Sequence, residues 1–529
     1  MSNSLNIIPK PQKAIRKDGI FVLSAGHRIS YPEAGRQAAQ LIQKLTGAVT
    51  VLNDGEIRLI SDPSIAGKEA YQLLVSGNGV ELRASTAAGF FYAAQSLRQL
   101  MPAELENGIS AAIVQIPYLH IEDSPRFEHR GFMLDVSRHF FGVDEIKNIL
   151  GLMALQKLNR FHWHLTDDQG WRIEIKKYPR LAEIGSIRKC SQVGGWILQK
   201  PIYDNKPYSG YYTQDEIREI VAYARSLFIE VIPELGMPGH ASAAMAAYPQ
   251  LTCDGQPVEV RPSVTTFSKP VCVGKEFVFE FMADVYREIA ELFPFGYIHI
   301  GGDEVNTKSW KNCPDCQKRM KDEGLKNGRD LQLYFENRLV KKLHSQGTNV
   351  IGWSEVVNDD LDENVINQYW IYTTRKNTIN AIKKGRKTII SDFSKMYLDY
   401  SFNAIELIRS YLFEPCFSEL SDAEEENIIG VEGPLWTEYV DSRERLYWQM
   451  FPRLTAISET AWCPKGVRDF PGYIERLAEF EERLAVLNIP HASKECYLKY
   501  RTISKVPQIF KILFTKDHPG NIEYKHFHG

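Results

Sequence analysis

Residues 297–304 read YIHIGGDE, a short apolar run that ends in two glycines and two adjacent acids, Asp303 and Glu304. Continuous apolar runs of this length are typical of strands that are buried on both faces, as in a parallel sheet. Glycines at the end of such a strand let the backbone turn sharply and come close to a ligand. The stretch therefore predicts a buried strand whose carboxyl end presents two carboxylic acids.

Seven other runs of the same texture are spread over the chain. They read GFMLDVS (131–137), RFHWHLTD (160–167), LFIEVIPEL (227–235), VIGWSE (350–355), VINQYW (365–370), TIISDF (388–393) and IIGVEGPLW (428–436). Helical patterns such as DEIKNILGLMALQKL (144–158) and TQDEIREIVAYARSL (213–227) fall between them. Strands that alternate with helices indicate a parallel sheet covered by helices, and eight such units predict an α/β fold of the (β/α)8 TIM-barrel type.

Two features of this pattern need comment. A doubly wound open sheet is the alternative architecture, and the count of eight units favours the closed barrel. Only nine residues separate VIGWSE from VINQYW, fewer than a crossover helix needs. We therefore expect the fifth helix of the barrel to be missing or reduced to a turn.

The first part of the chain has a different texture, with short strands and one apolar helix. EIRLIS (56–61), YQLLVS (71–76) and VELRAS (80–85) read as strands, and the Gly77-Asn78-Gly79 turn indicates a hairpin. The helix is expected over STAAGFFYAAQSLRQLM (85–101). We predict a small α+β domain over residues 1–118, the catalytic barrel over 119–490 and a tail over 491–529 to which no structure is assigned.

Composition excludes several classes of function. The 529 residues include 63 Lys and Arg against 66 Asp and Glu, and this net charge of -3 gives no basic field for nucleic acid. No apolar run approaches the roughly 18 residues that span a bilayer. The start MSNSLNIIPKPQK lacks the pattern of a secretory leader. We expect a soluble protein that is cytoplasmic as written, or periplasmic or secreted if a leader was removed.

Eight cysteines in a chain of this length are too sparse for a disulfide scaffold. Cys313-Pro314-Asp315-Cys316 resembles half a zinc site, but no second pair follows at the usual finger spacing. A loop dithiol or a disulfide is favoured over zinc, and neither a metal nor a cofactor is predicted.

Polar and aromatic side chains gather where the predicted strands end, which is where barrel enzymes carry their active sites. They are Asp135, Arg138, His139, Asp167, Asp168, Glu234, His240, Asp303, Glu304, Trp353, Glu355, Trp370, Tyr397, Asp399, Trp436 and Glu438, with Arg130 before the first strand. Taken singly, each has an ordinary explanation, since an Asp after a strand often caps a helix and a lone His or Trp often belongs to the core. Their convergence on one rim indicates a site.

Carboxylates and tryptophans without a metal-ligand pattern suggest carbohydrate chemistry. Indole faces provide flat apolar platforms for sugar rings, while carboxylates and Arg bind hydroxyls through charge-assisted hydrogen bonds. Cleavage of a glycosidic bond needs a protonated acid and a second negative group. Two neighbouring carboxylates near an apolar wall resist ionising together, so Asp303 and Glu304 can provide one acid and one base.

The motifs at these positions resemble glycoside hydrolase family 20, the β-N-acetylhexosaminidases. They are HRGFMLDVSRHF (129–140), NRFHWHLTDDQGWR (159–172), PELGMPGH (233–240), HIGGDEV (299–305), GW (352–353), QYW (368–370), YLD (397–399) and GPLWTE (433–438), in the order of the family. The start IIPKPQ and the α+β domain before the barrel also fit the family.

The resemblance implies an exo-acting enzyme that removes terminal non-reducing β-linked GlcNAc or GalNAc with retention of configuration. In this family the 2-acetamido oxygen of the substrate attacks the anomeric carbon, and an oxazolinium intermediate forms. Carried over to this chain, Glu304 is the general acid and then the base, and Asp303 orients the acetamido nitrogen. Tyr397 hydrogen-bonds the acetamido oxygen.

The same resemblance assigns substrate binding. Arg130 and Glu438 are expected to grip the 3-, 4- and 6-hydroxyl side of the sugar, with Asp399 beside them. His240 and Asp167 are expected to form a relay behind the general acid. The acetamido and ring pocket is expected to be walled by Trp353, Trp370 and Trp436.

Three alternatives remain open at this stage. A catalytically dead sugar-binding barrel would lack the acid pair, and a glycosidase with a carboxylate nucleophile would cleave sugars without an acetamido group. A metal-dependent hydrolase could use His162, His164 and His240. The loop over 190–212 is expected to shape the aglycone side, where Trp196 either stacks a second sugar or packs within the loop.

Overall fold

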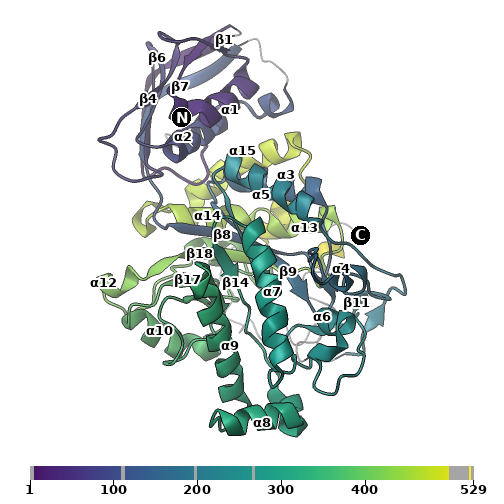
Figure 1. Ribbon diagram of the computed structural model, residues 1–529. Helices are drawn as coiled ribbons and strands as arrows, with labels where there is room; N and C mark the ends of the chain where they lie inside the picture. The colour runs from purple at the N-terminus through teal and green to yellow at the C-terminus, as the bar shows by residue number, and fades with distance from the viewer. Residues whose placement is uncertain are drawn as a thin grey trace.

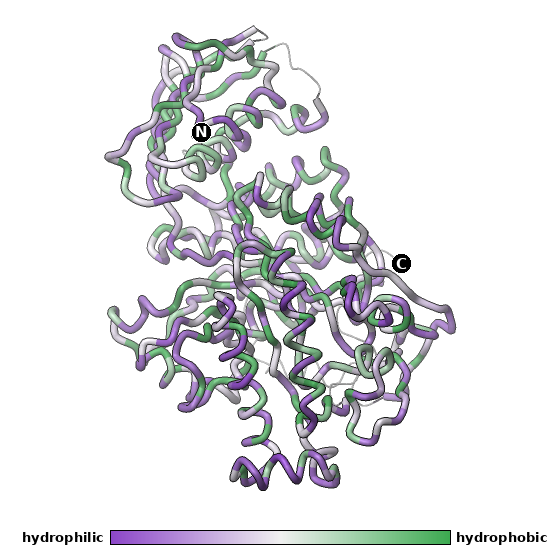
Figure 2. Tube along the Cα trace, viewed as in Figure 1, coloured by the Kyte–Doolittle hydropathy of each residue, from purple (hydrophilic) through white to green (hydrophobic). Residues whose placement is uncertain are grey.

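The computed structural model describes residues 5–24, 26–108, 113–195, 199–264, 268–499 and 523–525. A small N-terminal domain sits against one end of a larger helix-covered barrel (Figure 1). Hydrophobic segments follow the strands in the middle of the barrel, whereas outlying helices such as α8 (Pro314–Asp322) are largely hydrophilic (Figure 2). Trp196 and most of the predicted tail lie outside the described residues.

The N-terminal domain is built on a seven-stranded sheet with the strand order β1-β7-β5-β6-β4-β2-β3. The strands are β1 (Lys13–Ser24), β2 (Arg28–Ser30), β3 (Val49–Thr50), β4 (Ile57–Ser61), β5 (Tyr71–Ser76), β6 (Gly79–Ala84) and β7 (Ile113–Asp123). The predicted hairpin is confirmed, with Ser76 opposite Gly79 across the turn. Helices α1 (Arg36–Thr46) and α2 (Ala87–Leu100) pack together, and α2 lies on β5 and β6.

The expected domain boundary at residue 118 falls within strand β7. Strand β7 pairs with β1 up to Glu122 and with β5 up to Asp123, so the chain still belongs to the first sheet at residue 118. The Asp123 carboxylate then contacts the barrel, because it accepts from Lys157 Nζ at 3.0 Å and from Trp462 Nε1 at 2.9 Å. We propose that the boundary falls directly after Asp123.

The larger domain is a closed barrel of eight parallel strands. The strands are β8 (His129–Asp135), β9 (Arg160–Asp167), β13 (Glu230–Leu235), β14 (Tyr297–His299), β15 (Asn349–Trp353), β16 (Ile366–Tyr369), β17 (Thr388–Ile390) and β18 (Ile428–Leu435). Closure comes from β18, which pairs in parallel with β8 from Gly430 opposite His129 to Leu435 opposite Leu134. The predicted barrel is therefore confirmed, and the open sheet is excluded.

Helices cover the outside of this barrel and short elements interrupt its loops. The covering helices are α3 (Val143–Leu155), α5 (Gln214–Ser226), α7 (Glu276–Leu292), α9 (Gly328–Ser345), α10 (Arg375–Lys383), α11 (Leu407–Leu412), α13 (Arg443–Met450), α14 (Arg453–Trp462) and α15 (Phe470–Val486). Strand β15 leads to β16 through turns alone, all within the described chain, as the short interval predicted. Of the predicted tail, α16 (Lys494–Leu498) is described.

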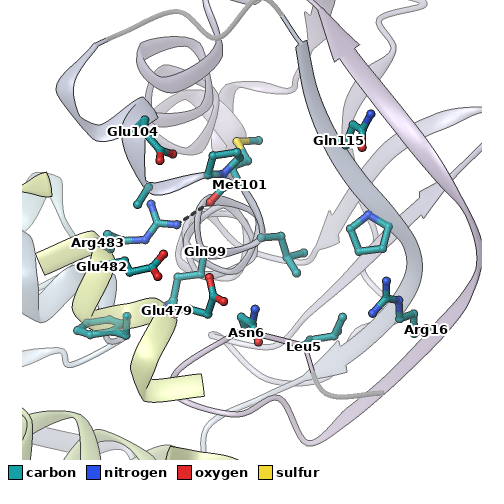
Figure 3. A pocket seen from close by; sticks show the side chains of 15 residues that line it. Leu5, Asn6, Arg16, Gln99, Met101, Glu104, Gln115, Glu479, Glu482 and Arg483 are labelled. Atoms are coloured by element: carbon teal, nitrogen blue, oxygen red, sulfur yellow. Dashed lines mark hydrogen bonds between the residues drawn. The ribbon is translucent and has the colours of Figure 1, made fainter. Parts of the chain in front are cut away.

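Charged and polar side chains join the two domains at the end of the barrel opposite the carboxyl ends of the strands. Arg483 of α15 donates to the Met101 carbonyl at 2.7 Å and to Glu106 at 2.5 Å. Beside this contact lies a pocket of about 430 Å³, shown in Figure 3. None of its lining residues follows the carboxyl end of a barrel strand, so this pocket is not the predicted site. No helix in the described part of the chain is long and apolar enough to cross a membrane.

Candidate active site

A tight turn after β14 presents the two adjacent acids. Gly301 and Gly302 have φ angles of 68° and 92°, and Glu304 itself has a φ of 48°, in the left-handed region that non-glycine residues seldom adopt. A Cβ on Gly302 would lie 2.2 Å from Val356 Cγ1, and one on Gly301 would lie 2.7 Å from Gly236 Cα. Both glycines are therefore required by space as well as by conformation. The strain at Glu304 is of order 1–3 kcal/mol and is typical of functional sites.

The acid pair faces His240, which comes from the loop after β13. His240 Nε2 lies 3.6 Å from Glu304 Oε2 and 3.7 Å from Asp303 Oδ2. Its other ring nitrogen, Nδ1, lies 3.1 Å from Asp167 Oδ1 at the end of β9. His240 also has a left-handed φ, 51°, so two neighbouring turns carry strained backbone at one place. The structure brings these four predicted residues together.

The electrostatics of this group depend on buried charges. Burial lowers the pKa of His240, but the charges of Asp167 and Asp303 outweigh it and raise the pKa well above its ordinary value. Burial raises the pKa of Asp303 to about 6, against the opposing effect of the His240 charge. Burial would also raise the pKa of Asp167, but Arg138 and His240 hold it well below its usual range. A protonated histidine thus lies between one firmly anionic acid and one acid that titrates near neutrality.

A polar network continues from Asp167 into the barrel. His164 Nε2 lies 3.0 Å from Asp167 Oδ2, and its Nδ1 lies 2.5 Å from Glu234 Oε2. The second Glu234 oxygen accepts from Trp353 Nε1 at 2.8 Å. Burial raises the pKa of Glu234, but the charges of His164 and His299 outweigh it and hold the pKa well below the usual range. The buried Glu234 carboxylate therefore fixes Trp353, and the buried His164 imidazole fixes Asp167.

Arg138, and not Arg130, is the arginine of this site. Arg138 follows the carboxyl end of β8 and lies 2.9 Å from Asp167 Oδ2. Its Nη1 lies 3.1 Å from Asp135 and 3.5 Å from Glu438 Oε1. The Arg138 guanidinium thus links Glu438 to Asp167, the carboxylate behind His240.

The prediction for Arg130 is wrong. Arg130 lies at the start of β8, and the strand ends five residues later at Asp135, about 16 Å away at a rise of roughly 3.3 Å per residue. Its guanidinium donates to both Glu69 oxygens at 2.8 Å, and its Cζ lies 5.0 Å from the centre of the Trp462 ring. Arg130 therefore holds the N-terminal domain against the bottom of the barrel.

The predicted tryptophans form one connected aromatic wall with Tyr397. Trp370 and Tyr397 stack with ring centroids 6.3 Å apart and planes 19° apart. Tyr397 lies 6.4 Å from Trp436, and Trp436 lies 6.1 Å from Trp353. Trp370 Nε1 donates to Glu355 at 2.8 Å. Burial, together with the Asp303 charge, raises the Glu355 pKa to about 8, so this carboxyl is protonated at neutral pH.

Asp399 and Glu438 complete the group on the side of Arg138. Asp399 is buried, and its Oδ1 has no hydrogen-bond partner among the described residues. Burial raises the pKa of Asp399 well above its usual range, and the charge of Glu438 adds to the shift. An unpartnered buried carboxyl oxygen is costly unless a ligand binds it. It therefore marks a place where sugar hydroxyls can donate.

Four side chains of the site had a signal in the sequence but no role in the predicted sugar site. Arg138, Glu234 and Glu355 end or follow barrel strands, and His164 precedes Asp167 on β9. Asp168 has the ordinary role that a single strand-end Asp suggests. Its Oδ1 accepts from the Ser242 backbone at 3.0 Å and from the Ser242 hydroxyl at 2.6 Å, at the start of α6 (Ser242–Ala247).

Two family models match the chain. The catalytic domain of glycosyl hydrolase family 20 matches residues 127–465, and domain 2 of the same family matches residues 4–124. The chain belongs to glycosyl hydrolase family 20.

Similar proteins support this assignment along most of the chain. A beta-hexosaminidase of Porphyromonas gingivalis is 38% identical over 89% of this chain, and one of Vibrio furnissii is 34% identical over 86%. The chain spans 62% of the length of the first protein and 76% of the second. The structure of a family 20 exo-β-N-acetylglucosaminidase from Vibrio harveyi, in complex with N-acetylglucosamine, is also similar. It gives a TM-score of 0.82 at 30% identity and covers 92% of this chain and 78% of that protein.

Proposed function

We propose that this family 20 chain is an exo-acting β-N-acetylhexosaminidase that removes terminal β-linked GlcNAc or GalNAc with retention of configuration. The observation that carries the proposal is that one ring nitrogen, His240 Nε2, faces both Asp303 and Glu304 at 3.6–3.7 Å. Two acids that converge on one point are poorly placed to act on opposite faces of a sugar. The attacking group then comes from the substrate itself, which is the acetamido oxygen.

In the first step the acetamido oxygen bonds to the anomeric carbon as the glycosidic bond breaks. The electrons of that bond pass to the departing oxygen, which takes the proton of Glu304. The Asp303 carboxylate accepts from the acetamido N–H and stabilises the positive charge of the oxazolinium. The Tyr397 hydroxyl donates to the acetamido oxygen and orients it.

In the second step water bonds to the anomeric carbon, and the carboxylate of Glu304 takes its proton. The bond to the acetamido oxygen breaks, so the product keeps the β configuration. His240, whose charge is sustained by Asp167, favours the carboxylate form of Asp303 through the cycle.

Sugar binding falls to the aromatic wall and to the Arg138 side of the site. Trp353, Trp370 and Trp436 enclose the ring and the acetamido methyl group. Asp399 and Glu438 accept hydrogen bonds from the sugar hydroxyls. Arg138, which lies beside Glu438, donates to the sugar hydroxyls in the role first assigned to Arg130. The expected substrates are GlcNAc-containing glycans, in keeping with the N-acetylglucosamine bound in the Vibrio harveyi structure.

The test is hydrolysis of a panel of aryl β-glycosides that differ only at C2 and C4. We expect cleavage of the 2-acetamido sugars and almost none of the β-glucoside. Brisk cleavage of the glucoside would indicate a protein nucleophile, and sugar binding without any cleavage would indicate a dead barrel. Activity that chelators abolish immediately, without a loss of folded protein, would indicate a metal-dependent hydrolase.

A further inference from the structure

Four cysteines that are scattered in the sequence converge beside the active-site loops. Cys253, Cys272, Cys313 and Cys316 each offer a sulfur, and these four atoms all lie within 4.8 Å of one another. Cys272 Sγ is 3.5 Å from Cys313 Sγ and 3.6 Å from Cys316 Sγ. Cys272 and Cys316 are fully buried and Cys313 is 3% exposed. The other four cysteines of the chain are not part of this group.

We propose that these four thiolates bind one zinc ion in a structural site. A tetrahedral zinc with Zn–S bonds of about 2.3 Å places its sulfurs about 3.8 Å apart, close to the separations observed. A disulfide requires about 2.05 Å, and all four cysteines are free thiols in the structure. Four soft sulfur ligands select zinc over the oxygen-loving cations. On binding, the four thiols release their protons and the ion fills the centre of the group.

The ligands come in two pairs from two consecutive barrel loops. Cys253 and Cys272 lie after β13, and Cys272 is 41 residues before Cys313 in the chain. Cys313 directly precedes α8, and Cys316 lies in the first turn of that helix. A CxxC pair at the start of a helix is a common zinc-binding unit. The sequence disfavours zinc because no second CxxC or CxxH pair lies at the usual finger spacing. Only the fold of the barrel brings Cys253 and Cys272 to this place.

Hydrogen bonds fix the chain on either side of the cysteines. Cys272 N donates to Leu251 O at 2.7 Å, and Trp310 Nε1 donates to Val271 O at 2.9 Å. A Cβ on Gly274 would lie 2.3 Å from Cys316 N, so glycine is required where the two ligand pairs meet. This close approach holds the four sulfurs together at little entropic cost.

The proposed zinc would join the two loops that carry the catalytic groups. Val271 N, next to Cys272, donates to Pro238 O at 3.0 Å, two residues before His240. On the other side, the 3-10 helix Thr307–Asn312 begins three residues after Glu304 and ends directly before Cys313. The ion would therefore fix the position of the His240 turn relative to the Glu304 turn.

The first experiment measures zinc in the tag-free full chain, purified without chelators or added metal. We expect one zinc per chain and its release, with one equivalent reported by a chromophoric chelator, when a mercurial blocks the thiols. Cys316→Ser and Cys253→Ser should lower the zinc content at least several-fold. Cys190→Ser, which removes a buried thiol outside the group, is the matched control and should retain one zinc.

A second measurement decides the matter even if those variants do not fold. Exchange of the wild-type chain with Co²⁺ should give the intense sulfur-to-cobalt absorption and the visible bands of a tetrahedral thiolate site. Zinc-free native protein whose four cysteines are alkylated without delay would overturn the proposal. Peptide mapping that finds Cys253, Cys272, Cys313 and Cys316 in disulfides would also overturn it. Neither result depends on activity, so the proposed glycosidase function is tested separately.

Discussion

The ring of His240 joins Asp167 to Glu304, with Nδ1 3.1 Å from the first carboxylate and Nε2 3.6 Å from the second. The Asp167 charge raises the pKa of the imidazole, and the imidazole charge in turn opposes the rise that burial gives to the pKa of Asp303. The proton affinity of Asp303 at the rim therefore depends, through His240, on Asp167 at the end of β9.

Glu304→Gln should lower kcat by roughly 10² to 10⁴, because the amide cannot donate a proton to the departing oxygen. The variant keeps the shape of the side chain, so binding of the reaction product should stay within a few-fold of wild type. Steady-state kinetics on an aryl β-GlcNAc substrate and calorimetric titration with GlcNAc measure the two effects. Near-normal turnover would remove Glu304 from the role of general acid.

Asp303→Asn should lower kcat by about 10² or more, since the developing oxazolinium loses its negative partner. The loss should be larger for 2-acetamido sugars than for any residual β-glucosidase activity, because only the former develop this charge. The ratio of kcat/KM values for the two substrates measures the difference. An equal loss on both would mean that Asp303 serves only the fold.

The acid side of the pH profile should report Asp303. Its pKa is about 6, so kcat/KM should fall as pH drops through this value and the carboxylate is protonated. The His240 charge lowers that pKa, and His240→Gln should therefore move the acid limb to higher pH. Profiles of kcat/KM for both proteins between pH 4 and 9 test the shift. A limb that stays in place would separate His240 from the titration of Asp303.

Arg138 and Arg130 should behave differently when each is replaced by Met, which keeps the volume but removes the charge. Arg138→Met should lower kcat/KM by about 10- to 100-fold, the value of one charged hydrogen bond. Arg130→Met should leave the kinetics of the folded protein within a few-fold. It should lower stability by about 3 kcal/mol, because Glu69 loses its buried partner. Kinetics and thermal unfolding on both variants would contradict this assignment if the effects were reversed.

Glu336 on α9 should limit stability in alkaline solution. It is fully buried, accepts from Gln332 at 2.7 Å, and burial raises its pKa to about 8. Because the folded value lies above the unfolded value of about 4.3, its stabilising effect is complete below that pH and is lost as pH rises through 8. Glu336→Gln should leave Tm nearly unchanged at pH 4.5 and raise it at pH 8.5. Equal Tm differences at the two pH values would exclude this titration.

Much of the architecture could be predicted because buried parallel strands leave a plain apolar record. All eight barrel strands, the hairpin at Gly77-Asn78-Gly79 and the missing fifth helix are confirmed. The same rule, that function collects at the carboxyl ends of strands, pointed to the acid pair and the three tryptophans. It also pointed to Arg138, and the choice of Arg130 went against it, because a motif does not tell which of its two arginines faces the rim.

Other features depend on contacts between residues that are distant in the chain. Burial raises the pKa of Asp303, whereas the charges of Arg138 and His240 lower the pKa of Asp167, although His240 lies 73 positions further along the chain. The four-cysteine group likewise requires the loops after β13 and β14 to meet. The spacing of residues along the sequence does not show which distant loops come into contact. Apolar periodicity, in contrast, does indicate which segments are strands.

The ion pair of Arg130 with Glu69 has a practical meaning for anyone who trims this protein. A barrel that begins at residue 124 would keep the buried Arg130 guanidinium but would lack Glu69, its counter-charge. The two halves are thus one cooperative unit, and they should melt together in a single calorimetric transition. Expression of the barrel alone would therefore require either the N-terminal domain or a redesign of the barrel end around Arg130.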